Sequence, residues 1–407
     1  MTVKKIVAAT ATLASLMGSA AWADTTLNAL FMSQAAYSED NIKEMTAAFE
    51  SANPGVSVEL EFVPYEALHD KIIAAAGAGD DGYDVVLFDV IWPAEFADGG
   101  FLQDVTNRIP ADLTDKIFDG AWTTVQYDGK RYGMPWILDT KYLFYNTEIL
   151  AKAGIETPPS TWEEVLEQAK TIKDKGLVEY PLVWSWSQSE AMICDFTTLT
   201  AANGGTFFDD GKPAFETGGA KAALDYMTSS LKDGLTNPAS LEYFEEDVRR
   251  VFSTGDAAFA MNWTYMNALV NDPAESQVAG KVGVISAPGV AGQSEASAVN
   301  GSMGLGIPSN SPHADEAWAY ITHLTQRGVQ EDYATLSLPI WKASYDEAKV
   351  TGGQEDLVAA ADKSIAVMAS YTEVSSILQK HIHGALLGEA TAEEALSDAA
   401  KRVARIR

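Results

Sequence analysis

Polar and aromatic residues follow strongly apolar segments at several points of this chain. Asp89 and Asp139 each stand after an apolar run, where an acidic residue is otherwise out of place. The segment 259–265, FAMNWTY, begins as an apolar strand and then changes to an amide, an indole, a hydroxyl and a phenol. Carboxylates and amides exchange hydrogen bonds, and aromatic rings offer flat apolar faces. Together these groups predict that strand ends bind a small polar molecule, although Asp89 could instead cap the segment after Trp92.

The ten tryptophans fall into two groups. Four lie in a leader sequence, in amphipathic helices or away from any strand end, so we set them aside: Trp22, Trp122, Trp162 and Trp318. The others follow strands or lie in loops, where a ring can face a ligand: Trp92, Trp136, Trp184 or Trp186, Trp263 and Trp341. Alternation along 259–265 leaves open whether Trp263 or Tyr265 faces the ligand, beside Asn262.

The elements that position these residues begin with an alternation of strand and helix. Apolar runs at 25–32, 56–63 and 83–90 predict strands, and amphipathic runs at 39–54 and 65–79 predict helices. This order is typical of a parallel α/β sheet with right-handed crossovers. Ligands bind such sheets beyond the carboxyl ends of the strands. Ser33 and Gln34 end the first strand, and Asp89 and Trp92 follow the third.

The rest of the chain continues this mixture. Asp128-Gly129 predicts the two-residue turn of a hairpin. Further strands are expected at 137–146, 180–186, 281–290 and 298–308, with helices between them, one of which has the acidic first turn Phe244–Asp247. The C-terminal third is predicted to be helical, including a helix at 355–364.

The first 23 residues have the features of a secretory signal peptide. Lys4 and Lys5 precede a short apolar run, and Ala21-Trp22-Ala23 provides small residues for cleavage. Without these lysines, the 28 basic residues become 26 against 57 acidic ones, a formal charge of −31. Such a surface repels phosphate backbones and anionic lipid, so we expect no nucleic-acid or membrane-surface binding.

Cysteine and histidine content argues against a disulfide or metal site. Cys194 is the single cysteine, and we expect it to be a small buried hydrophobe. His381 and His383 are two residues apart and would not share a helix face. We therefore expect no metal and no cofactor.

Seven stretches in register resemble one known family. They include AAFESANPGVSVELEFVPY, YDVVLFDVIWPAEFADGGFLQDVT, YDGKRYGMPWILDTKYLFYNTEIL, PPSTWEEV, VFSTGDAAFAMNWTY, GLGIPSNSPHADEAWAYI and GEATAEEAL. The chain is similar, over almost its whole length after residue 23, to the extracellular solute-binding proteins of ABC importers, the family that includes maltose- and trehalose-binding proteins.

The resemblance implies a two-lobed periplasmic binding protein of the class II type, with the ligand in the cleft between the lobes. Each lobe would be a mainly parallel sheet flanked by helices, and several chain crossovers would form the hinge. By this analogy residues 24–136 and 300–336 form the first lobe. Residues 137–299 and 337–407 form the second.

The same resemblance assigns site residues. Asp89 matches a hydroxyl-binding carboxylate, Asp139 an acid of the hinge, and Trp263 or Tyr265 an aromatic ring under the sugar. The stretch VWSWSQSEAMICD matches the family at Gln188 and Glu190 but has Trp186 in place of glycine and Ser189 in place of tyrosine. Further positions are the backbone of Gly301 and Ser302, Trp341 where arginine is frequent, and Lys141, which we expect on the surface.

The leading hypothesis is a non-enzymatic, monomeric periplasmic carrier. It would capture a carbohydrate or polyol, close by hinge motion and deliver it to a membrane permease. One alternative is a periplasmic glycoside hydrolase in which Asp89 acts with Asp139 or Glu190. Another is the same carrier fold with a polyamine or phosphodiester as ligand.

Overall fold

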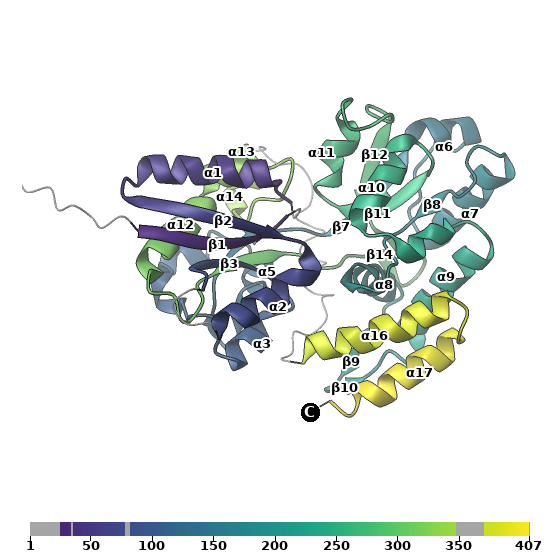
Figure 1. Cartoon of the computed structure of the whole chain (residues 1–407). Helices are drawn as coiled ribbons and strands as arrows, with labels where there is room; N and C mark the ends of the chain where they lie inside the picture. The colour runs from purple at the N-terminus through teal and green to yellow at the C-terminus, as the bar shows by residue number, and fades with distance from the viewer. Residues whose placement is uncertain (1–24, 34–35, 78–81, 347–369, 407) are drawn as a thin grey trace, which may run out of the picture.

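The computed structural model describes residues 25–33, 36–77, 82–346 and 370–406. Its buried apolar residues form separate cores, one built from residues 27–138 and 303–340, the others from 143–287 and 374–403. Figure 1 shows the two lobes that surround these cores, with the N-terminal lobe on the left. The structure confirms the two-lobed α/β architecture. The expected signal peptide (1–23), Gln34 and the expected helix at 355–364 lie outside the described residues.

A five-stranded sheet forms the centre of the first lobe, in the order β2-β1-β3-β15-β6. Its strands are β1 (Thr25–Met32), β2 (Val56–Val63), β3 (Val85–Asp89), β6 (Met134–Ile137) and β15 (Met303–Gly306). All five residues of β3, VVLFD, are buried, as expected of a central strand covered on both faces. β1 pairs in parallel with β2 and β3, whereas β15 is antiparallel to β3 and β6.

Short helices and one hairpin complete the first lobe. The helices are α1 (Glu39–Ala52), α2 (Tyr65–Ala76), α3 (Pro93–Asp98), α4 (Ala111–Thr114), α5 (Asp119–Thr123), α12 (Ala314–Leu324), α13 (Arg327–Asp332), α14 (Lys342–Asp346) and the 3-10 turn η2 (Thr106–Arg108). The predicted hairpin is confirmed as β4 (Gln126–Tyr127) and β5 (Lys130–Arg131). Its turn residues Asp128 and Gly129 both have positive φ, at 47° and 72°, which a two-residue hairpin turn requires.

A four-stranded sheet with the order β12-β7-β11-β8 forms the centre of the second lobe. Its strands are β7 (Lys141–Asn146), β8 (Leu182–Val183), β11 (Phe259–Trp263) and β12 (Val282–Ser286). β7 is antiparallel to both neighbours, and only β8 and β11 pair in parallel. By direction, three of the four strands of this sheet and four of the five strands of the first sheet run the same way, so the expectation of mainly parallel sheets is confirmed, with β7 and β15 as the antiparallel strands. In both lobes, a strand that enters from the other lobe runs against its neighbours.

Eight described helices of 6 to 16 residues surround the second sheet. They are α6 (Thr147–Ala153), α7 (Trp162–Asp174), α8 (Glu190–Ala202), α9 (Gly218–Lys232), α10 (Glu245–Thr254), α11 (Met266–Asn271), α16 (Tyr371–Leu386) and α17 (Ala392–Val403), with the 3-10 turn η3 (Pro238–Glu242). Two small hairpins join them: β9 (Phe208–Asp209) with β10 (Lys212–Pro213), and β13 (Pro288–Val290) with β14 (Ser294–Ala296). The C-terminal pair α16 and α17 packs on α8 and α9 (Figure 1).

Local sequence explains where several of these helices begin and end. Ser38 caps α1 and Thr391 caps α17, each through a reciprocal capping box. Asn146 accepts hydrogen bonds from two backbone amides of α6, and Gly154 ends that helix with a φ of 74°. None of the helices in the described part of the chain is long and apolar enough to span a bilayer.

Two connections between the lobes lie within the described residues. The chain crosses between β6 and β7 at residues 138–140, and returns through residues 297–302 before β15. We expected the second lobe to resume at residue 337. Residues 338–342 instead pack in the first lobe, where Leu338 and Ile340 are core residues and the backbone of Lys342 bonds to that of Lys116. α14 therefore belongs to the first lobe, and α16 is the next described helix of the second.

Candidate functional site

A cavity of about 800 Å³ lies between the two lobes. The carboxyl ends of β1, β3 and β11 contribute to its walls, through Ser33, Asp89 and Trp263. β15 is antiparallel, so its amino end, with Met303, faces the same space. The rule that ligands bind beyond strand ends thus locates this cavity correctly.

Four helices begin at the cavity. The first residues of α2, α8, α10 and α16 all line it: Tyr65, Glu190, Glu245 and Tyr371. Each helix also has an acidic residue in its first turn. The partial positive charge of a helix amino terminus is therefore matched by an acid of the same helix.

Asp89 is the buried acid that the first lobe presents to the cavity. Its Oδ1 accepts a hydrogen bond of 3.1 Å from the amide of Ile91. Burial raises the pKa of Asp89 to about 7, although that hydrogen bond opposes the shift, and the nearby charge of Glu190 raises it further. At neutral pH this carboxyl group is therefore divided between its charged and uncharged forms.

Asp139 lies in the first crossover, where it fixes the position of the second lobe's strand end. Its Oδ1 accepts hydrogen bonds from the amide of Thr140 at 2.9 Å, the amide of Thr264 at 3.1 Å and the hydroxyl of Thr264. Its backbone also binds the returning crossover, because its carbonyl accepts from the amide of Gly301 at 3.1 Å. Burial raises the pKa of Asp139 to about 7 against the effect of the Thr264 hydrogen bonds.

Glu190 is held by the C-terminal helix α16. Its two carboxylate oxygens accept hydrogen bonds from the hydroxyls of Tyr371, at 2.6 Å, and Ser375. Burial raises the pKa of Glu190 in spite of these bonds. A residue near the middle of the sequence is thus positioned by a helix near its end.

Trp263 is half-buried and presents its indole to the cavity. Its Nε1 donates a hydrogen bond of 3.2 Å to Glu245, and its amide donates one of 2.8 Å to the side chain of Asn262. The ring packs against Gly301, which leaves no room for a β-carbon there. The ring is therefore fixed on one side by a hydrogen bond and on the other by the crossover. Tyr265 also lines the cavity but is only 4% exposed.

The first lobe supplies an aromatic surface of its own. Trp92 stacks on Tyr65, with ring centroids 5.6 Å apart and an interplanar angle of 25°. The ring of His69 lies 5.2 Å from that of Trp92 and 3.1 Å from both Asp70 and Glu95. Trp92 itself is only 3% exposed, so the half-buried ring of Tyr65 is the aromatic face that the first lobe presents to the cavity.

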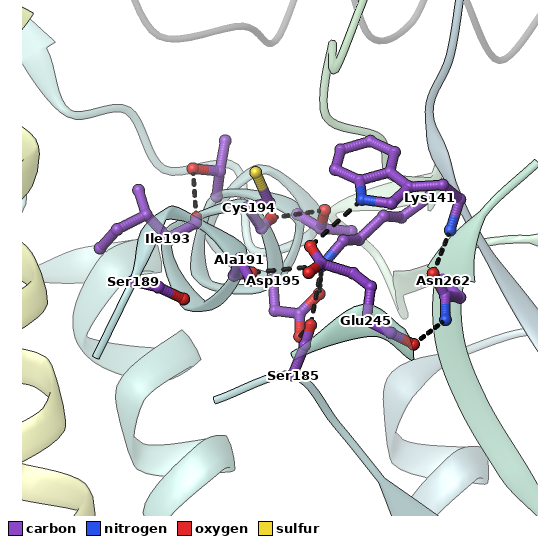
Figure 2. A network of polar contacts seen from close by, with 12 residues as sticks. Lys141, Ser185, Ser189, Ala191, Ile193, Cys194, Asp195, Glu245 and Asn262 are labelled. Atoms are coloured by element: carbon purple, nitrogen blue, oxygen red, sulfur yellow. Dashed lines mark hydrogen bonds and ion pairs between the residues drawn. The ribbon is translucent and has the colours of Figure 1, made fainter. Parts of the chain in front are cut away.

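Lys141 is completely buried, which corrects our expectation that it lies on the surface. Its Nζ lies 2.8 Å from Asp195, 3.1 Å from Ser185 and 3.2 Å from the carbonyl of Ala191, as Figure 2 shows. Burial acts to lower the pKa of Lys141, but Asp195 and then Glu245 raise it above its ordinary value. The ion pair compensates the desolvation of both groups.

The same ammonium group connects to the cavity wall. Lys141 Nζ is 3.6 Å from Glu245 and 5.1 Å from the centre of the Trp263 ring. Cys194 is close to this network and also lines the cavity, and burial raises the pKa of its thiol. Glu245 therefore contacts both the buried ammonium group of Lys141 and the indole of Trp263 at the cavity wall.

The structure places nine of the sequence-predicted site residues on the cavity wall. They are Ser33, Asp89, Trp92, Asp139, Gln188, Glu190, Trp263, Tyr265 and Gly301.

Five other predicted residues lie away from the cavity, so their assignment to its wall is corrected. Trp136 is in the core of the first lobe, and Trp186 stacks on Trp184 in the core of the second. The amide of Asn262 is turned into the lobe, where it binds the backbone of Glu245. Ser302 Oγ accepts the amide of Asp139, and Trp341 donates to the carbonyl of Thr325 in the first lobe.

Sequence reasoning missed several residues that the cavity brings together. They include Tyr65, His69, Glu245, Tyr371 and Ser375. The sequence predicts Glu245 only as part of the acidic first turn of a helix. The structure confirms that position and shows that the same turn borders the cavity. The sequence indicates a role for Glu245 in the site only through its short distance from the segment FAMNWTY.

Comparison with known proteins agrees with this geometry. A family model described as bacterial extracellular solute-binding protein matches residues 35–331. A putative binding protein of Brucella abortus is 26% identical over 370 residues, which is 88% of each chain. Among solved structures, maltose-bound MalE3 of T. maritima is 31% identical, with a TM-score of 0.85 over 93% of this chain and 99% of that one.

A second solved structure has a similar likeness. The ABC transporter solute-binding protein of Thermotoga lettingae, bound with α-D-tagatose, is 27% identical and has a TM-score of 0.83 over 94% of this chain and 99% of that one. The family model covers well over half of the sequence, and the whole fold is shared with these structures. This chain therefore belongs to the bacterial extracellular solute-binding proteins.

Proposed function

We propose that this protein is the periplasmic carrier of an ABC importer and that it captures a carbohydrate or polyol in the interlobe cavity. The observation that carries the proposal is the composition of that cavity. Aromatic faces and hydrogen-bonding carboxyl groups converge on it from both lobes: the half-buried Tyr65 and Asp89 from the first, Trp263 and Glu190 from the second. Sugars and polyols need both kinds of group, because they carry hydroxyls at their edges and C–H surface on their faces.

The half-buried indole of Trp263 is the proposed stacking surface. Its hydrogen bond to Glu245 and its contact with Gly301 hold the ring in place before a ligand arrives. Tyr265 is almost completely buried and offers less of its ring. Pre-organisation of this kind lowers the entropy cost of binding. The solved relatives, whose ligands are maltose and tagatose, support a carbohydrate as the ligand class.

Closure of the lobes is the proposed way in which the ligand is enclosed. Besides the crossovers, Thr372 of α16 donates a hydrogen bond of 2.8 Å to Glu95 of α3, which connects the lobes across the cavity. A ligand in contact with both lobes would add to this contact and favour the closed arrangement. An affinity in the micromolar range corresponds to about −8 kcal/mol, which several hydrogen bonds and one stacked ring can supply.

Delivery to permease subunits in the inner membrane and action as a monomer belong to the same proposal. They follow from the family and from the expected signal peptide. No catalytic step is included in it.

One observation favours a second candidate, a periplasmic glycoside hydrolase. Asp89 has a pKa of about 7 and faces the same cavity as Glu190, and a hydrolase needs two carboxyl groups of which one is a proton donor. A carrier leaves its ligand intact, whereas a hydrolase does not. The two candidates therefore differ in the chemical state of the ligand after binding.

A thermal-shift screen of the protein without its first 23 residues tests the proposal. Mono- and disaccharides, linear polyols, phosphorylated sugars and polyamines are compared at equal concentrations. We expect a neutral or amino-substituted sugar or polyol to raise the melting temperature and to be recovered unchanged by mass spectrometry. Recovery of a cleaved product would establish the hydrolase. Stabilisation by a phosphorylated sugar alone, or by no compound with hydroxyl groups, would overturn the carbohydrate assignment.

A further inference from the structure

Within the described part of the chain, three acids that face the cavity have no cationic partner. Asp89, Asp139 and Glu190 form no ion pair with any lysine or arginine among the described residues. Their hydrogen-bond donors are all neutral: backbone amides, threonine and serine hydroxyls, and tyrosine. Buried charges without a counter-charge cost several kcal/mol each, so such groups are usually paired.

The basic side chains near the cavity already have acidic neighbours. Lys141 forms ion pairs with Asp195, at 2.8 Å, and with Glu245, at 3.6 Å. Arg250 lines the cavity, but its side chain is 65% exposed and lies 3.3 Å from Asp247. His69 lies between two carboxylates, Asp70 and Glu95. None of these groups neutralises the three acids.

Helix amino termini compensate only part of this charge. Glu190 begins α8, and the positive end of a helix stabilises an anion by about 0.3–1 kcal/mol. Asp89 ends a strand, and Asp139 lies in a crossover, so neither belongs to the first turn of a helix. The charge on these two residues has no such support.

Asp139 has one carboxylate oxygen to which no described residue donates a hydrogen bond. All three hydrogen bonds to its carboxylate are made by Oδ1, and Oδ2 accepts none from the described residues, although the residue is 96% buried. Asp139 as a residue borders the cavity.

We propose that the ligand carries a positively charged amino group as well as hydroxyls, as in an amino sugar or an amino polyol, and that its ammonium group binds between Asp89 and Glu190. This inference rests on the proposed function and names the ligand class more closely. Asp89 and Glu190 come from opposite lobes and line one cavity. Without a cation their charges repel each other across the closing lobes. An ammonium group between the two carboxylates would be attracted to both of them and would therefore hold the two lobes together.

A neutral polyol would satisfy the hydrogen bonds of these acids but would leave their charge buried when the lobes close. The acids would then have to take up protons, and burial does raise the pKa of Asp89 and Asp139 to about 7. An anionic ligand would add a further like charge. The cavity thus ranks ligands of equal shape in the order cation, neutral molecule, anion.

Matched ligand pairs test the inference. Isothermal titration at pH 7, where the amino groups are mostly protonated, and at low salt compares glucitol with 1-amino-1-deoxyglucitol, and glucose, galactose and mannose with their 2-amino derivatives. N-acetylated derivatives keep the added nitrogen but remove its charge, and the corresponding uronates reverse it. For at least one pair we expect the amine to bind at least tenfold more tightly than its neutral partner, N-acetylation to remove the gain, and 300 mM salt to reduce it.

Two variants locate the effect. Glu190→Gln and Asp89→Asn should each reduce the amine-to-neutral affinity ratio by at least fivefold. Asp174→Asn, which changes an exposed acid of α7 paired with Lys170, should leave the ratio unchanged. Circular dichroism melting curves establish that each variant is folded, and either of the two cavity variants suffices for the test.

The outcomes separate this inference from the proposed function. If neutral sugars or polyols bind as tightly as their amines, the inference is overturned and the carbohydrate carrier stands. If the amine preference is present but unchanged in both cavity variants, the assignment to Asp89 and Glu190 is overturned. If putrescine binds while no compound with hydroxyl groups does, or nothing binds, the proposed function fails and the inference fails with it.

Discussion

The indole ring of Trp263 lies directly against the α-carbon of Gly301, so that a β-carbon at this position would overlap the ring. Trp263 ends a strand of the second lobe, and Gly301 belongs to the crossover that returns to the first. The contact therefore joins the proposed stacking surface to the hinge. Only a residue without a side chain allows the ring and the crossover to approach this closely.

Replacing Gly301 by alanine should move the Trp263 ring away from its hydrogen bond with Glu245. Overpacking of this kind typically costs about 1–3 kcal/mol of folding stability. We also expect ligand affinity to fall at least fivefold, because the stacking face is displaced. Chemical denaturation and isothermal titration measure the two effects. Gly328→Ala is the matched control, since a β-carbon at Gly328 meets nothing within 4 Å.

Removing the indole itself should have a larger effect on binding. Trp263→Ala deletes the stacking surface, and we expect the ligand dissociation constant to rise at least tenfold, about 1.4 kcal/mol. Trp263→Phe keeps an aromatic face but loses the Nε1 donor to Glu245, so its affinity should be intermediate. Titration of both variants against the wild type checks this order. Unchanged affinity in Trp263→Ala, with a folded protein, would remove Trp263 from the site.

The alternation of strand and helix in the first lobe could be predicted from the sequence, because it depends on local periodicity. The same is true of the hairpin turn at Asp128-Gly129. The direction of β7 and β15 could not, since it depends on which lobe a strand enters from. The run YPLVWSW shows another limit. Only Leu182–Val183 pair as a strand, because the amides of Trp184 and Trp186 donate to Ser240 instead of continuing the ladder.

Site residues that directly follow a strand could be predicted from the sequence. Residues whose position depends on partners far away in the sequence could not. Asp89 and Trp263 could be identified from their places at strand ends. Lys141 looked like a surface lysine, because its partner Asp195 is 54 residues away in the sequence. The hydroxyls that hold Glu190 come from a helix 181 and 185 residues further on. No periodicity in a single sequence encodes such pairings.

Loss of the buried lysine should strongly destabilise the fold. Lys141→Met leaves Asp195, which is completely buried, without its counter-charge, and breaking a buried pair in this way costs about 3–5 kcal/mol. The double variant Lys141→Met/Asp195→Leu removes both charges and should recover most of that loss. Urea denaturation measures both values. The exposed pair provides a control: Lys170→Met should change the stability by less than about 1 kcal/mol. A double variant as unstable as the single one would contradict this account.

The stability of the ligand-free protein should depend on pH through Asp89 and Asp139. Burial raises the pKa of each carboxyl to about 7 from its ordinary value of 3.8. Between these values the folded protein binds more protons than the unfolded chain, so the free energy of unfolding falls as pH rises through this window. The contribution is fully present below about pH 4 and is lost above about pH 7. Other groups titrate in the same range, so the informative quantity is the difference between wild type and variant.

Asp139→Asn isolates this contribution, because asparagine can accept the same Thr264 hydrogen bonds without a charge. We expect the variant to be more stable than the wild type at pH 8 and to lose that advantage as the pH falls to 5. Urea denaturation at pH 5, 6, 7 and 8 measures the difference. Asp174→Asn, at an exposed position on α7, should show no such trend. A difference that is constant with pH would mean that the Asp139 carboxyl keeps its ordinary pKa in the folded protein.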